Sequence, residues 1–246
     1  ATESVLMAMP VHTHAFGTLS QCKSARSESS FASLSKMPLT IPDHIECLIL
    51  DLFGVIVTFD DRLVYDRIAQ RCLEPDRAVH QMLDLVSNPD LIRGRTSLEQ
   101  LHAKLVADLG LSASLDEFRD MWIAPYSEPM PGIRALLRQL TGKCRLVLLS
   151  NVDRHYWPTV RASIPELQAF HAHVLSFKQG VAKPEPEAFR RAVASGGVAV
   201  ERSYFVDDKP ENIDAAASVG LAGHVSAVVL GCARHFVKAD WMWCKS

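Results

Sequence analysis

The chain has 246 residues, a length that fits one large domain or a core with a small accessory domain. Its 26 basic residues nearly balance its 28 acidic ones, and the net charge of −2 supplies no field for gripping nucleic acid or anionic lipid. With 48% hydrophobic and 22% charged residues, the composition is that of a soluble globular protein and excludes an intrinsically disordered chain.

The six cysteines are scattered, with no CxxC pair and no spacing typical of a zinc site or a disulfide framework. We therefore expect a reducing compartment and a cytoplasmic protein. No apolar run approaches the roughly 20 residues needed to cross a bilayer, so we expect no membrane partner. The pattern leaves the oligomeric state open.

Residues 1–42 differ from the rest of the chain, because they are rich in serine and lack sustained periodicity. We expect this segment to be disordered. Its serine-rich, acid-poor composition also fits an organelle transit peptide, although arginines are few and no amphipathic face is evident. The aliphatic run over residues 45–50 then predicts the first buried strand of a parallel sheet.

Between residues 61 and 127 the apolar residues recur at helical spacing. Over residues 79–86 they fall at i, i+3, i+4 and i+7, the pattern of an amphipathic helix. For a second helix, Thr96 and Glu99 predict a capping box at the start and Gly110 a left-handed cap at the end. Residues 61–127 are therefore predicted to form an all-helical unit.

From Pro131 onward the pattern alternates between helices and strands, which is typical of βα units and a parallel sheet. We expect a helix that starts at Pro131. Further helices are expected at about 153–163, 185–195 and 211–219, and strands at 146–149, 173–175 and 204–206.

Polar side chains directly follow these apolar runs. Ligands gather at the carboxyl ends of parallel strands, so the side chains are expected to converge on one crevice. They are Asp51 after the first strand, Ser150 and Asn151 after the second, Lys183 in the loop after the third, and Asp207 and Asp208 after the fourth.

The types of these residues predict their chemistry. Asp51, Asp207 and Asp208 would repel one another unless a hard dication such as Mg²⁺ neutralised them. With the metal and Lys183 facing the phosphoryl oxygens, an aspartate can attack phosphorus and form an aspartyl-phosphate that water then hydrolyses. The pattern therefore predicts a phosphomonoesterase for a small phosphorylated metabolite.

Four motifs in order resemble those of the haloacid dehalogenase-like hydrolases that carry a helical cap. They are DLFGV at Asp51, LSN at Ser150, KPEPEAF at Lys183 and VDDKPENI at Asp207, within residues 45–226. Within the family, the LSN, AKPE and VDDKPENI segments are similar to those of the glucose-1-phosphate phosphatases, and the phosphatase domains of soluble epoxide hydrolases are similar too. The resemblance implies an α/β fold, with a Rossmann-like core formed by residues 43–60 and 128–246 and a cap formed by 61–127.

The resemblance also implies a Mg²⁺ site. Asp51 would be the nucleophile and a metal ligand, with the backbone carbonyl of Phe53 and the Asp208 carboxylate as further ligands. Asp207 would support the metal directly or through water, and Asn212 would lie in the outer shell.

The implied phosphate site consists of the Ser150 hydroxyl, the Asn151 backbone and the Lys183 ammonium. The chain departs from the family at Phe53, where most of these phosphatases carry an aspartate that serves as general acid and base. Without that acid, good leaving groups should be favoured, and the anomeric oxygen of a sugar 1-phosphate is one.

Two other functions remain open at this point. A haloacid dehalogenase also uses an aspartate nucleophile, but it works without metal, and the pair Asp207 and Asp208 would repel its carboxylate substrate. Alternatively, the chain is a non-catalytic binding module that kept the fold and lost turnover with Phe53.

Overall fold

The computed structural model describes residues 41–60, 62–86, 89–124 and 127–226. The expectation of a disordered or targeting segment over residues 1–42 therefore falls, Ile41 and Pro42 apart, outside the described residues. Within those ranges, no helix is both long and apolar enough to cross a lipid bilayer.

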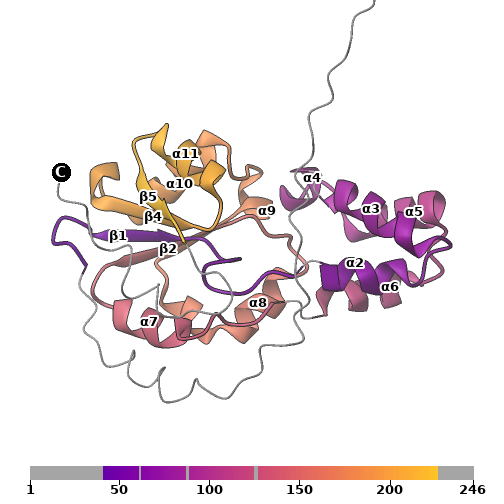
Figure 1. Ribbon diagram of the computed structural model, residues 1–246. Helices are drawn as coiled ribbons and strands as arrows, with labels where there is room; N and C mark the ends of the chain where they lie inside the picture. The colour runs from indigo at the N-terminus through magenta and orange to yellow at the C-terminus, as the bar shows by residue number, and fades with distance from the viewer. Residues whose placement is uncertain (1–40, 61, 87–88, 125–126, 227–246) are drawn as a thin grey trace, which may run out of the picture.

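A five-stranded parallel sheet forms the centre of the core, with strand order β3-β2-β1-β4-β5 (Figure 1). The strands are β1 (Cys47–Leu50), β2 (Arg145–Ser150), β3 (Ala172–Leu175), β4 (Ser203–Asp207) and β5 (Ala222–Val225). Strand β1 lies in the middle and is buried along its whole length, which explains its unbroken aliphatic sequence. The predicted Rossmann-like α/β core is confirmed.

Helices cover both faces of this sheet, with α7 and α8 on one side and α10 and α11 on the other (Figure 1). The helical elements of the core are α7 (Ile133–Leu140), α8 (Trp157–Ser163), η1 (Pro165–Ala169), α9 (Ser176–Gln179), α10 (Pro186–Gly196), η2 (Val200–Arg202) and α11 (Pro210–Ala217). Successive side chains of β1 point to opposite faces of the sheet. Leu48 and Leu50 pack against the face covered by α7, and Cys47 and Ile49 pack against the face covered by α10.

A separate group of helices, called the cap below, occupies residues 62–123. It consists of α2 (Arg62–Ala69), α3 (Pro75–Val86), α4 (Pro89–Ile92), α5 (Leu98–Leu109) and α6 (Leu115–Ile123). The cap has a hydrophobic cluster of its own, in which Ile68, Leu98 and Phe118 are fully buried. The cap is therefore stabilised largely by contacts among its own helices.

The capping box of α5 lies one residue later than predicted. Its partners are Ser97 and Gln100: the Gln100 N–H donates to Ser97 Oγ at 3.2 Å and the Ser97 N–H donates to Gln100 Oε1 at 2.9 Å. The pairing of Thr96 with Glu99 is wrong, because Ser97 is the N-cap residue, with an extended backbone, and Leu98 is the first helical residue. Gly110 ends the helix with φ +61°, as predicted.

The capping box gives the first testable prediction. We expect Ser97→Ala to lower the free energy of unfolding by about 1 kcal/mol, because the Gln100 N–H at the start of α5 loses its acceptor, Ser97 Oγ. The matched control is Thr96→Ala, for which we expect a clearly smaller loss. Urea unfolding of both variants measures the difference, and equal losses would contradict the assignment.

Candidate active site

The acidic residues meet because their strands are neighbours. Strand β1 pairs with β4, so Asp51, which follows β1, lies next to Asp207, the last residue of β4. The Asp51 N–H donates to the Val206 carbonyl at 2.9 Å and fixes this register. Asp51, Asp207 and Asp208 each place a carboxylate oxygen within 4.8 Å of the others.

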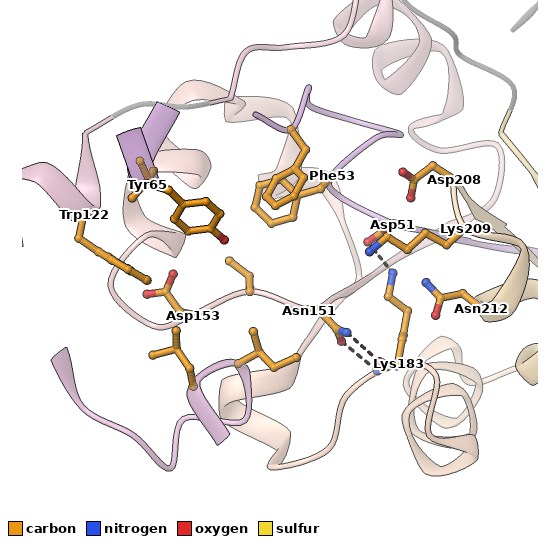
Figure 2. A pocket seen from close by; sticks show the side chains of 15 residues that line it. Asp51, Phe53, Tyr65, Trp122, Asn151, Asp153, Lys183, Asp208, Lys209 and Asn212 are labelled. Atoms are coloured by element: carbon orange, nitrogen blue, oxygen red, sulfur yellow. Dashed lines mark hydrogen bonds and ion pairs between the residues drawn. The ribbon is translucent and has the colours of Figure 1, made fainter. Parts of the chain in front are cut away.

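Lys183 binds two of these carboxylates at once. Its Nζ lies 2.6 Å from Asp51 Oδ1 and 2.6 Å from Asp207 Oδ2, and all three side chains are at most 8% exposed. Asn151 holds the lysine loop in place, because its Nδ2 donates to the Lys183 carbonyl at 2.8 Å and its Oδ1 accepts the Lys183 N–H at 2.9 Å (Figure 2). The Asn151 side chain is thus a positioning group, a role that sequence reasoning had missed.

Burial and the neighbouring charges shift the pKa of Asp51, Lys183 and Asp208. Burial raises the pKa of the Asp51 carboxyl to about 7, although the Lys183 ammonium opposes the rise and the Asp207 carboxylate adds to it. For Lys183, burial acts to lower the pKa, but the two carboxylates outweigh it and the pKa is raised. Burial and the Asp207 charge raise the pKa of Asp208. One ammonium among three carboxylates leaves room for a further cation.

The donors present fit Mg²⁺. Asp208 Oδ1 is buried and makes no hydrogen bond within the described part of the chain, as expected of an oxygen reserved for a cation. Asp207, by contrast, already accepts three hydrogen bonds, since Oδ1 accepts the Lys209 N–H at 2.9 Å and Asn212 Nδ2 at 2.8 Å, and Oδ2 accepts Lys183. Asp51 and Asp208 would therefore hold the metal, with Asp207 and Asn212 behind them; the Phe53 carbonyl stays a prediction.

The loop after β1 is a tight turn that touches the acidic cluster. The Gly54 N–H donates to the Val57 carbonyl at 2.8 Å, and the Leu52 N–H donates to Asp51 Oδ1 at 2.7 Å. Gly54 has φ +77°, and a Cβ at this position would overlap the Asp208 carboxylate. The glycine of the DLFGV motif thus allows the turn and the acidic pair to lie in contact.

A cavity of about 140 Å³ opens from this cluster toward the cap (Figure 2). Its polar end is lined by Asp51, Asn151, Lys183, Asp208, Lys209 and Asn212. The Ser150 hydroxyl is buried and makes no hydrogen bond to the described residues, but Ser150 is not part of this lining. Its predicted phosphate contact therefore stays a prediction.

Sequence reasoning missed the residues that approach the cavity from the other side. Tyr65 of α2 and Trp122 of α6 line it, as does the buried carboxylate of Asp153, whose Oδ1 accepts the backbone N–H groups of His155 and Tyr156 at 2.8 and 3.1 Å. Asp153 follows β2 by three residues, a detectable signal. No sequence signal marks the two aromatic residues, because their position depends on how the cap packs.

Contacts between the cap and the core hold the end of α4 next to the loop that carries Lys183. Arg93 donates through Nε and Nη2 to Glu185 Oε1 at 3.1 and 2.8 Å, and Glu185 also accepts the Ala182 N–H at 2.7 Å. Ser176 Oγ donates to the Ile92 carbonyl at 2.5 Å. The cap is thus tied to the segment that carries Lys183.

Comparison with known proteins agrees with this geometry. A family model described as haloacid dehalogenase-like hydrolase matches residues 45–220. The chain is 25% identical over 142 residues to a sesquiterpene phosphatase of Aspergillus oryzae, a match that covers 57% of this chain and 72% of that protein.

Solved structures share the architecture. A wild-type HAD family enzyme from Bacteroides thetaiotaomicron, in complex with magnesium and inorganic phosphate, has a TM-score of 0.66 at 20% identity, and the match covers 78% of this chain and 98% of that one. The L-2-haloacid dehalogenase of Xanthobacter autotrophicus has a TM-score of 0.54 at 20% identity, with 75% and 78% covered. At this identity the likeness establishes the fold alone.

The contact between Gly54 and Asp208 leads to a prediction on metal binding. We expect Gly54→Ala to weaken Mg²⁺ binding at least about tenfold, because the new methyl group displaces the Asp208 carboxylate. The matched control is Gly142→Ala, since Gly142 has φ +80° but no atom lies within 4 Å of the point that an added Cβ would occupy. Titration calorimetry with Mg²⁺ compares the two, and equal affinities would contradict the role of Asp208.

Proposed function

Because the chain belongs to the haloacid dehalogenase-like hydrolases, we propose that it is a Mg²⁺-dependent phosphatase of small phosphate monoesters. The observation that carries this proposal is the buried cluster in which Lys183 contacts Asp51 and Asp207 while Asp208 Oδ1 is left without a hydrogen bond to the described residues. A substrate phosphate and a dication together supply the charges that this cluster lacks.

The geometry of Asp51 supports its role as nucleophile. Within the part of the chain that the structure describes, the Leu52 N–H and Lys183 Nζ both contact Oδ1 of its carboxylate. We infer that Oδ2 attacks phosphorus, the ester oxygen departs with the bonding pair, and a phosphoryl group remains on Asp51 until water displaces it. When bound, Mg²⁺ supplies positive charge that neutralises the phosphoryl oxygens. The Lys183 ammonium adds a second positive charge next to the Asp51 carboxylate.

The leaving group receives no proton from the residue two positions after the nucleophile. Phe53 stands there, and its ring packs against Phe59 at a centroid distance of 5.0 Å. General acid help is typically worth about 10²–10⁴-fold, so among esters that bind equally well, those whose leaving group bears negative charge well should react faster.

Two substrate classes are consistent with this proposal. The sequence-based expectation is a sugar phosphate, in particular a sugar 1-phosphate with its acidic anomeric oxygen. The Aspergillus relative is named a sesquiterpene phosphatase, which suggests phosphate esters of apolar hydrocarbons as the second class. A haloacid is disfavoured, because its carboxylate would face the charges of Asp207 and Asp208.

The proposal is tested with acetyl phosphate and p-nitrophenyl phosphate, two phosphoryl donors with good leaving groups. We expect phosphate release with Mg²⁺ and none after chelation, because the carboxylates then repel the phosphate dianion. Asp51→Asn should lose at least about 10³-fold in kcat, since the amide keeps the shape without the nucleophile.

The matched control is Asp43→Asn, because Asp43 is an exposed aspartate of the core outside the cavity lining. Its activity should equal that of the wild type. Full activity in EDTA with the metal shown to be absent would refute the proposal, and chloride release from 2-chloropropionate in place of phosphate release would establish the dehalogenase instead.

A further inference from the structure

The end of the cavity that lies farthest from Lys183 is lined by the cap. Figure 2 places Tyr65, Trp122 and Asp153 on one side of the cavity, and Asp208, Lys183 and Asn212 on the other. The apolar side chains of the lining are Phe53, Phe59, Val64, Leu91, Ile92 and Val152. A substrate whose phosphate lies at the acidic cluster therefore points its organic group into mainly apolar surroundings.

An aromatic wall begins directly beside the nucleophile. The Phe53 ring is stacked on the Tyr156 ring at a centroid distance of 6.4 Å and packs against Phe59 at 5.0 Å. Phe59 keeps 50% of its surface exposed although it is a large apolar residue. A hydrocarbon group bound in the cavity would cover part of that surface.

Polar partners for a sugar are scarce at the cap end of the described lining. They are the Tyr65 hydroxyl, the Trp122 indole N–H and the Asp153 carboxylate, and Oδ1 of Asp153 already accepts two backbone N–H groups. A sugar would exchange the water around several hydroxyl groups for few hydrogen bonds, which costs affinity. A hydrocarbon carries no hydroxyl groups that must give up their water.

We propose that this site selects phosphate monoesters of flat, unsaturated hydrocarbons, either an aromatic ring or a short prenyl chain. The inference rests on the proposed phosphatase function and names its substrate class. The lining at the cap end fits this class, since a flat hydrocarbon packs against aromatic and aliphatic side chains and brings no hydroxyl groups of its own to desolvate. Phe53 then acts as a specificity residue, placed where it contacts the first carbon atoms beyond the phosphate.

The test compares esters of primary alcohols, so that the leaving oxygens have similar basicity. The substrates are benzyl phosphate, dimethylallyl phosphate and glucose 6-phosphate, and acetyl phosphate reports whether the wild-type enzyme performs the chemistry. We expect kcat/KM for the better of the two hydrocarbon esters to exceed that for glucose 6-phosphate at least about tenfold. The ratio between benzyl and dimethylallyl phosphate identifies which hydrocarbon is preferred.

A variant of Phe59 tests whether the aromatic wall of Phe53 and Phe59 causes this substrate preference. Phe59→Ala should lower the preference for the hydrocarbon ester about fivefold, because half-exposed Phe59 contributes contact area but little to the folded core. Leu73→Ala is the matched control, since Leu73 is an 83% exposed cap residue outside the cavity lining, and it should leave the preference unchanged.

The outcomes separate this inference from the proposed function. If the wild type hydrolyses acetyl phosphate but favours glucose 6-phosphate, or if Phe59→Ala keeps the full preference, the substrate class is wrong and the phosphatase stands. If the wild type releases phosphate from none of the four compounds, the proposed function fails, and this inference fails with it.

Discussion

The contact on which the site depends is the one between the Lys183 ammonium and two buried carboxylates. Removal of Lys183 would leave two buried carboxylates without a compensating charge, and neighbouring groups hold these side chains in place. Asn151 holds the backbone of Lys183 on both sides of the residue, and Asn212 holds Asp207. The parallel sheet makes this arrangement possible, because it ends the strands that carry the carboxylates at one edge.

The cluster also divides the cavity into two chemical environments. Charge is concentrated where Asp51, Lys183 and Asp208 meet, and apolar side chains from the segment after β1 and from the cap line the rest. Phe53 stands at the boundary between them. A carboxylate at this position would transfer protons, whereas the phenyl ring begins an aromatic wall. The chain thus combines the acidic cluster of a phosphatase with apolar and aromatic surroundings for the group that carries the phosphate.

The sequence was sufficient for those features that depend on local pattern. The strands that flank the site were predictable because they are buried aliphatic runs, and their polar ends followed from the geometry of parallel sheets. Strand β5 was missed, since its sequence AGHV contains a glycine and is only partly buried. The capping box of α5 was predicted one residue too early, because Ser97 and Gln100, which form it, directly follow Thr96 and Glu99 and fit the same spacing. Tyr65 and Trp122 could not be placed at all, because packing of the cap brings them to the cavity.

The central claim is that Asp51 is the nucleophile, oriented by Lys183, and trapping of the covalent intermediate tests it most directly. Rapid acid quenching of the enzyme during turnover of radiolabelled acetyl phosphate, followed by peptide mapping, locates the phosphoryl group. The account predicts label on the peptide that contains Asp51, and no label in Asp51→Asn. Label on another residue, or turnover in which no phosphoryl-enzyme forms, would contradict it.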